Sequence, residues 1–269
     1  MDASTAILEA PLRHPGASLD DIDVGWADSE ANVREAQHLR YRVFAQEMGA
    51  RLGPAADAAK LDADRFDAYC DHLIVRSFGP GTAESGAVVG TYRVLSPAQA
   101  RRAGGYYTDT EFDLSPLAPL RAGAVELGRS CVDAQWRRGG VIMAMWGALA
   151  GYMQQRDLHT MIGCASVSMA DGAGPAFALW RRLAQLYMAE ERWRVQPREP
   201  LATHLETSAS SDDASTVQAP PLVKGYLRCG ARLLGPPALD TAFNTADLPM
   251  ILRIEHMAPR YRRHFLGAA

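Results

Sequence analysis

A glutamate and an arginine stand three residues apart in the segment 124–132, AVELGRSCV, whose composition predicts a β-strand. On a regular strand, Glu126 and Arg129 point to opposite faces, so they can serve one site only if a β-bulge intervenes. Such a bulge would re-aim a side chain and free backbone groups.

The loop that follows this strand could bind an anion. Two arginines and two glycines stand there directly before an apolar helix: Arg137, Arg138, Gly139 and Gly140. Guanidinium groups pair with phosphate oxygens, and a helix N-terminus presents free N–H groups. A phosphate or pantetheine group would fit this loop, although the same four residues could also form a plain connection.

Three further groups of polar residues lie upstream. They are Arg40 to Phe44 on a predicted helix, Asp64 to Asp67 in a loop, and Gly90 to Arg93 on a predicted strand. Each group has an ordinary explanation when it is taken alone. The arginines could be solvated or form structural ion pairs, and the aspartates could be turn and capping residues.

The elements that must position these residues alternate between strands and helices. The sequence predicts strands at 22–27, 71–77, 87–95, 124–132, 160–165, 222–234 and 249–255. It predicts helices at 29–48, 98–103, 139–155 and 175–189, and a short basic helix near the C-terminus. This order gives an α/β fold with one mixed sheet flanked by helices.

The chain is long enough to bury a core, and we expect a single domain. Residues 1–20 are expected to be a flexible N-terminal segment, and 21–269 the domain itself. Within the domain, the Ser/Thr-rich stretch 203–220 is expected to be a mobile loop, and 221–269 a C-terminal extension with a basic tail.

Composition excludes several classes of protein. Apolar residues make up 48% and charged residues 22% of the 269 residues, which is typical of a globular domain and excludes disordered, collagen-like and coiled-coil chains. No apolar run is long enough to span a bilayer, and the acidic residues near the N-terminus argue against a secretory signal. A cytoplasmic location is therefore expected. The four cysteines are far apart, which favours reduced thiols over a disulfide or a metal site.

Taken together and in this order, the motifs resemble those of acyltransferases. The run Arg40-x-x-x-Phe44, Asp64-x-x-Asp67, Gly90-x-x-Arg93 and Glu126-x-x-Arg129 is similar to the acyl-homoserine-lactone synthases, a branch of the GNAT-type fold. Those enzymes take an acyl chain from acyl carrier protein. That family has a tryptophan six residues beyond the helix phenylalanine, whereas this chain has Ala50 and is also longer.

A sister family, the ornithine lipid N-acyltransferases once called hemolysin-like, resembles this chain more fully. The shared tracts cover roughly residues 25–255 and are Leu39–Phe44, Asp64–Asp67, Val88–Arg93, Gly104–Leu117, Glu126–Val132 and Pro221–Leu252. The resemblance implies a GNAT-like fold and transfer of a 3-hydroxyacyl group from acyl carrier protein to the α-amine of L-ornithine. It implies lyso-ornithine lipid as the product, and no bound cofactor other than the donor's 4'-phosphopantetheine arm.

The resemblance also suggests what the acidic and basic residues do. Glu126 would be a general base, directly or through water, or would bind an ornithine ammonium group. Arg93 and Arg129 would position Glu126 and the acidic loop Asp64–Asp67. Asp64 and Asp67 would bind the ornithine side-chain ammonium or pair with Arg93. The substrate-binding set is expected to comprise Arg40, Phe44, Asp64 and Asp67.

The donor is expected to lie along the strand that carries Glu126. Backbone N–H groups of Ser130, Cys131 and Val132 would polarise the thioester, and the loop Arg137–Gly140 would face the phosphopantetheine. The strands that carry Arg93 and Glu126 should be neighbours, splayed from the next strand to admit the pantetheine arm. Tyr187 could protonate the leaving thiolate or simply pack in the core.

Acyl carrier protein and L-ornithine are the expected partners, and no nucleic acid is expected. The basic C-terminal part suggests an anionic partner or a solvated face. The predicted tail helix, 257–266, has a basic side and an apolar side with Tyr261 and Phe265. It could make transient contact with the inner membrane surface as a peripheral element, or these rings could pack on the domain.

Three other functions remain open at this point. An acyl-homoserine-lactone synthase would need S-adenosylmethionine as its amine substrate. An N-acyl amino acid synthase would use another acceptor, such as glycine or tyrosine. A binding module for acyl carrier protein or membrane, with a decayed site, would have no turnover. The presence of Glu126, Arg129 and Arg93 argues against this last alternative.

Overall fold

An eight-stranded mixed sheet forms the centre of the computed structural model, which describes residues 21–78, 86–137, 140–204 and 218–267. The strands follow the order β1-β2-β3-β5-β6-β10-β8, and β9 pairs with β10. Every pair of neighbours is antiparallel except β5 and β6, which run parallel. The strand bounds are β1 Ile22–Trp26, β2 Asp71–Ser77, β3 Ala87–Leu95, β5 Ala124–Val132, β6 Thr160–Ser168, β8 Arg232–Leu233, β9 Ala238–Asp240 and β10 Thr245–Arg253.

A second, two-stranded sheet consists of β4 (Phe112–Asp113) and β7 (Gln196–Pro197). The α-helices are α1 Glu30–Tyr41, α2 Pro54–Ala59, α3 Pro97–Ala103, α4 Thr108–Glu111, α5 Val141–Gln155, α6 Ala173–Tyr187, α7 Pro221–Cys229 and α8 Pro259–Leu266. A π-helical turn, Arg42–Glu47, continues α1. Short 3₁₀ segments occupy Asp67–Tyr69, Ser115–Gly123, Ala134–Trp136, Glu191–Trp193, Leu201–His204 and Ile254–His256.

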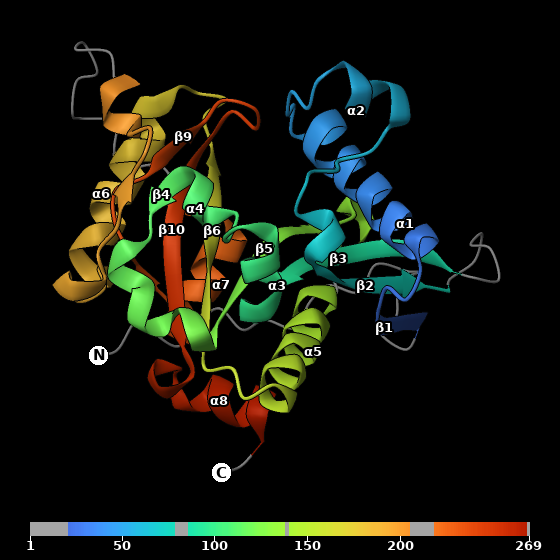
Figure 1. Ribbon diagram of the computed structural model, residues 1–269. Helices are drawn as coiled ribbons and strands as arrows, with labels where there is room; N and C mark the ends of the chain where they lie inside the picture. Colours follow the sequence, from blue (N-terminus) through green and yellow to red (C-terminus); the bar gives the residue numbers. More distant parts are fainter. Residues whose placement is uncertain (1–20, 79–85, 138–139, 205–217, 268–269) are drawn as a thin grey trace, which may run out of the picture.

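Helices cover both faces of the sheet. Because side chains alternate along β2, Ile74 packs against α1 on one face, while Leu73 and Val75 pack against α5 on the other. Figure 1 shows α1 and α5 on opposite sides of β2 and β3. The predicted mixed α/β sheet with flanking helices is confirmed.

Local sequence signals explain most of the predicted elements. The strands at 71–77, 87–95 and 124–132 have the predicted bounds. Ser29 caps α1 by accepting a hydrogen bond from the Asn32 N–H, as its position before the helix predicts. The expected flexible segment 1–20, the first hairpin connection at 79–81 and most of the expected loop 203–220 lie outside the described residues.

The prediction of a strand at 222–234 is wrong. Helix α7 occupies most of this segment, and only Arg232–Leu233 forms a strand. The helix begins with Pro221 in its first turn, buries Val223 and Leu227 four residues apart, and ends at Gly230 with φ 112°. The segment between the first predicted helix and the acidic loop, for which no element is predicted, contains the short helix α2.

The tail helix α8 forms as predicted, and its apolar side packs on the domain. The ring of Phe265 contacts Trp146 of α5 at 6.2 Å between centroids, and Tyr261 stacks on Phe265. Of the two alternatives for these rings, the structure therefore has the packed one. Tyr261 and Phe265 nevertheless stay partly exposed. Within the described residues, no helix is both long and apolar enough to cross a membrane.

Strands β5 and β6 separate after three residues. Ala124–Glu126 pair with Thr160–Ile162. Beyond these residues both strands continue, but they no longer pair with each other. Gly163 lies at the point of separation, where a Cβ would be only 2.3 Å from the Leu127 carbonyl oxygen. The expectation that β3 and β5 are neighbours and that β5 splays from the next strand is confirmed.

Replacing Gly163 by alanine should destabilise the sheet. The new methyl group would meet fixed backbone, so the strands must shift at a cost of about 1–3 kcal/mol in the free energy of unfolding. Urea denaturation of the purified variant measures this cost. Gly147→Ala is the control, because helix α5 leaves open space there, and alanine should stabilise that helix by about 0.5–1 kcal/mol. Equal stability of the two variants would contradict the steric argument.

Candidate active site

A cavity of about 700 Å³ lies where β5 and β6 separate. Strand β5 lines it from Glu126 to Val132, and β6 lines it from Gly163 to Ser166. Further lining residues come from β3, α5, α7 and the β9–β10 region: Arg93, Ile142, Trp146, Leu222, Tyr226, Asp240, Phe243 and Asp247. The cavity therefore joins segments that are far apart in the sequence.

Strand β5 contains a bulge, which is the condition under which Glu126 and Arg129 could serve one site. Arg93 pairs with Gly128 and Thr91 pairs with Cys131, so Arg129 and Ser130 together face the single residue Tyr92. Arg129 has φ 49°, in the left-handed region that non-glycine residues rarely adopt. The bulge turns the Arg129 guanidinium toward Asp62 and Asp64, at 3.3 and 3.2 Å.

Glu126 is a buried carboxylate, 5% exposed, at the wall of the cavity. One oxygen accepts hydrogen bonds from the Thr108 N–H at 2.7 Å and its hydroxyl at 2.5 Å, and the other accepts one from the Tyr107 N–H at 2.7 Å. Burial raises the pKa of Glu126 above its usual range, and these hydrogen bonds oppose the rise. The site therefore holds a fixed carboxyl group of increased basicity.

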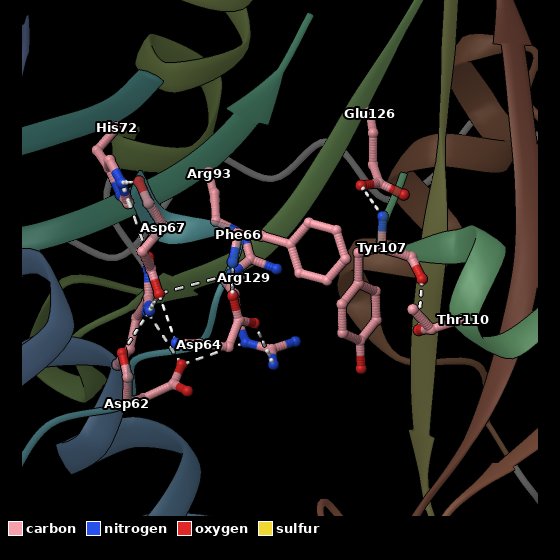
Figure 2. Close-up of polar contacts among 11 residues, drawn as sticks. Asp62, Asp64, Phe66, Asp67, His72, Arg93, Tyr107, Thr110, Glu126 and Arg129 are labelled. Atoms are coloured by element: carbon pink, nitrogen blue, oxygen red, sulfur yellow. Dashed lines mark hydrogen bonds and ion pairs between the residues drawn. The ribbon is translucent and has the colours of Figure 1, made fainter. Parts of the chain in front are cut away.

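The arginines are not what fixes Glu126, contrary to expectation. Neither Arg93 nor Arg129 hydrogen-bonds it, and the start of α4 does so instead. Figure 2 shows Glu126 separated from the acidic loop, with the rings of Phe66 and Tyr107 between them. The tract GGYYTDTEFDLSPL, which contains this part of α4, carried no site residue in the sequence prediction.

Arg40 is fully buried, with 0% exposure, and binds the acidic loop. Its guanidinium lies 2.9 Å from a carboxylate oxygen of Asp62 and 2.7 Å from one of Asp67, and it also bonds the Asp62 carbonyl. The Arg40 charge and hydrogen bond lower the pKa of Asp67 to about 2, against the effect of burial. Arg40 and Asp67 do not line the cavity, so in this structure they support the site rather than contact a substrate.

The other two arginines bind the same loop from the sheet. Arg93 lies 2.7 Å from Asp64, and Arg129 lies 3.2 Å from the second oxygen of that carboxylate. These charges lower the pKa of Asp64 even though it is partly buried. Of the two roles left open for Asp64 and Asp67, ion pairing with arginine is the one present here. Phe44, at the end of the first helix, does line the cavity.

The expected donor-binding residues divide into three groups. Ser130, Cys131 and Val132 line the cavity on the part of β5 that has left β6. Arg137 also lines it, with its guanidinium paired to Glu47, 2.7 Å for one nitrogen–oxygen pair. Gly140 caps α5. Arg138 and Gly139 lie outside the described residues.

Two phenols meet at the cavity wall, and neither is Tyr187. The Tyr226 hydroxyl of α7 hydrogen-bonds the Tyr92 hydroxyl of β3, which also accepts from the Trp146 indole at 3.2 Å. Burial raises the pKa of both phenols, so both stay protonated. Tyr187 packs against a hydrophobic cluster and does not line the cavity, which matches the core-packing alternative. The missed Tyr226 stands in the block mispredicted as a strand.

Comparison with known proteins identifies relatives of the whole chain. A family model described as an acetyltransferase (GNAT) domain matches residues 39–147. An L-ornithine N(alpha)-acyltransferase of Brucella abortus (strain 2308) is 36% identical, over 92% of this chain and 89% of the relative. One of Rhizobium meliloti (strain 1021) is 32% identical, over 98% and 92%.

A solved structure of the same fold is FeeM, an N-acyl amino acid synthase from uncultured soil microbes. It is 10% identical, with a TM-score of 0.50 over 87% of this chain and 90% of that chain. At this identity the likeness concerns the fold alone. Together with the matching domain, it shows that the sheet described above is a GNAT acyltransferase fold.

Removing the Arg40 charge should destabilise the protein strongly. Arg40→Met leaves Asp62 and Asp67 buried without their main counter-ion, which should lower the free energy of unfolding by about 3–5 kcal/mol in urea denaturation near pH 7. The pKa of Asp67 is lowered from 3.8 to about 2, so its carboxylate is charged in both states above pH 4. The loss in free energy of unfolding caused by Arg40→Met should therefore reach its full size above pH 4. It should shrink as the pH falls toward 2.

Arg34→Met, on the exposed side of the same helix, is the matched control and should change stability by less than about 0.5 kcal/mol. Equal effects of the two substitutions would show that the buried network is not what Arg40 contributes.

Proposed function

The chain belongs to the L-ornithine N(alpha)-acyltransferase family, and we propose that it moves a 3-hydroxyacyl chain from acyl carrier protein to the α-amine of L-ornithine. The product is then lyso-ornithine lipid. The observation that carries the proposal is Glu126, a buried carboxylate of raised pKa at the wall of a cavity between separated strands. Amide formation from an amine and a thioester needs a base at such a place.

The reaction requires two proton movements. The α-amine attacks the thioester carbonyl carbon and must lose a proton, which Glu126 accepts directly or through a water molecule. The C–S bond then breaks, and the leaving thiolate needs a proton. Tyr226 lines the cavity with a neutral hydroxyl, and its bond to Tyr92 orients it, so it is our candidate for this acid.

The separated part of β5 offers a place for the donor. Between Leu127 and Val132 the strand has no partner on its β6 side, so its backbone N–H groups there can bind a pantetheine amide or polarise the thioester carbonyl. Apolar residues of α5 and α7 line the adjoining wall and suit an acyl chain: Ile142, Met143, Trp146, Leu222 and Val223.

Arginines at the rim suit an acidic carrier. Arg137 is partly exposed beside α5, and Arg228 is exposed on α7; both line the cavity. Acyl carrier protein is acidic, and opposite charges raise the encounter rate and fix the orientation of two proteins. We therefore propose acyl carrier protein, rather than free acyl-CoA, as the donor.

Glu126→Gln should lower turnover by about 10²–10⁴-fold, because it keeps the size of the side chain and removes the base. In the wild type, kcat should rise with pH through the raised pKa of Glu126, since only the carboxylate can accept a proton. Steady-state assays with 3-hydroxyacyl carrier protein and ornithine, with the product identified by mass spectrometry, measure both effects. Glu255→Gln, on an exposed side chain, is the control. Near wild-type turnover of Glu126→Gln would remove it from the mechanism.

The double variant Arg137→Glu with Arg228→Glu should raise the KM for acyl carrier protein by about tenfold or more. The KM for ornithine should stay within about twofold, because neither arginine belongs to the acceptor side. The wild-type KM for the carrier should also rise with salt, which screens exposed charges. Arg181→Glu, an exposed arginine of α6, should leave both constants unchanged. Equal efficiency with free acyl-CoA would contradict the choice of donor.

A further inference from the structure

One wall of the cavity is acidic, and none of the residues discussed so far accounts for it. Asp240 of β9 and Asp247 of β10 both line the cavity. Cys164 of β6 lines it as well, and Glu111 of α4 lies behind them. The ligand atoms of Glu111, Cys164 and Asp247 lie within 4.8 Å of one another. We call Glu111, Asp240 and Asp247 the acidic wall. Asp247 is 4% exposed, which makes it one of the most buried carboxylates of the protein.

Within the described residues, no basic side chain forms an ion pair with the acidic wall, although the Arg129 charge lowers the pKa of Asp247 from further away. The ion pairs found there include no arginine, lysine or histidine bound to Glu111, Asp240 or Asp247. Asp247 accepts a hydrogen bond from Thr245 of its own strand, and one buried oxygen of Glu111 has no partner at all. A buried acceptor left in this state is costly unless a ligand satisfies it.

The acidic wall lies on the same side of the sheet as Glu126. Glu126 pairs with Ile162, Cys164 is two residues further along β6, and Asp247 pairs with Ser166. A line of contacts joins the two places: the Thr108 hydroxyl bonds Glu126 at 2.5 Å and lies 3.8 Å from the Cys164 thiol. The first residue of helix α4, Thr108, therefore binds Glu126, and the last residue of the same helix, Glu111, belongs to the acidic wall.

We propose that the acidic wall binds the side-chain ammonium of the amino-acid acceptor and so selects a diamino acid. This inference rests on the proposed function. With the δ-ammonium held there and kept protonated, only the α-amine is free to lose a proton near Glu126. The wall would thus select both the substrate and the nitrogen that is acylated.

The chemistry of the wall fits an ammonium group. An ammonium has three N–H donors, and two acceptors at about 2.8 Å around it lie about 4.6 Å apart. The carboxylate oxygens of Glu111 and Asp247 lie within 4.8 Å of one another, so both could accept from one ammonium. Burial raises the pKa of both Glu111 and Asp247. Repulsion from Asp247 adds to the rise for Glu111, and repulsion from Asp240 adds to the rise for Asp247, so a bound cation would relieve both.

The test compares ornithine with norvaline, which has the same carbon chain without the δ-amine. Wild-type kcat/KM should favour ornithine by on the order of 10²-fold or more, because norvaline offers the acidic wall no N–H donors. Asp247→Asn and Asp240→Asn should each lower kcat/KM for ornithine by about tenfold or more. For norvaline, kcat/KM should stay constant or rise, so the preference collapses. Asp113→Asn, an exposed aspartate of β4, should keep the wild-type preference.

Three outcomes would overturn the inference. The variants could keep the preference for ornithine, or they could lose both substrates equally while still melting like the wild type. Treatment with EDTA could abolish ornithine turnover until a divalent metal is restored, which would make the wall a metal site. If Asp247→Asn does not fold, Asp240→Asn decides, because its side chain is only half-buried.

Calorimetric titration separates this inference from the proposed function. Ornithine should bind wild-type protein at least about tenfold more tightly than norvaline, and Asp247→Asn should remove that difference. If ornithine binds in this way but no acylated product forms, the proposed transfer reaction is wrong and the acidic wall stands as a diamine site. If acylation occurs without any such difference in binding or turnover, the acidic wall is not the selecting element.

Discussion

The early separation of β5 from β6 is the constraint on which the rest of the site depends. Strand backbone that leaves its partner exposes N–H and carbonyl groups that need other partners. Here the separation begins directly after Glu126 and Ile162, and Gly163 allows the two backbones to come close just before they part. The opening therefore places unpaired backbone, a buried carboxylate and an apolar wall around one space.

The buried charges hold the β5 side of this opening in place. Arg40 ties α1 to the acidic loop, while Arg93 and Arg129 tie β3 and β5 to the same loop. Such a network gains little stability over apolar packing, but removing one member leaves its partners uncompensated. Its physical role here is geometric, because it fixes the left-handed bulge of β5 that brings Arg129 to the loop.

The sequence was most informative where the side-chain pattern is local. Strands β2, β3 and β5 and the Ser29 cap follow from alternation and capping rules. The spacing of Glu126 and Arg129 showed only that one site would need a bulge between them, and the structure has it. Strand β10 is buried along nearly its whole length, so its start at Thr245 carries no alternating signal. Tyr226 and Asp247 belong to the site only because β10 lies beside β6 and α7 packs nearby, and sequence spacing does not show this.

The two acidic parts of the cavity differ in how their carboxylates are satisfied. Glu126 is buried but accepts three hydrogen bonds from α4 and the residue before it, so its position is fixed without a ligand. Asp247 is also buried and lies close to the half-buried Glu111, of which one oxygen has no hydrogen-bond partner. A preorganised group suits a proton transfer, whereas an unsatisfied pair suits binding of a cation. Helix α4 contacts Glu126 through Thr108 and contributes Glu111 to the acidic wall. Its short length therefore fixes the distance between the general base and the acidic wall.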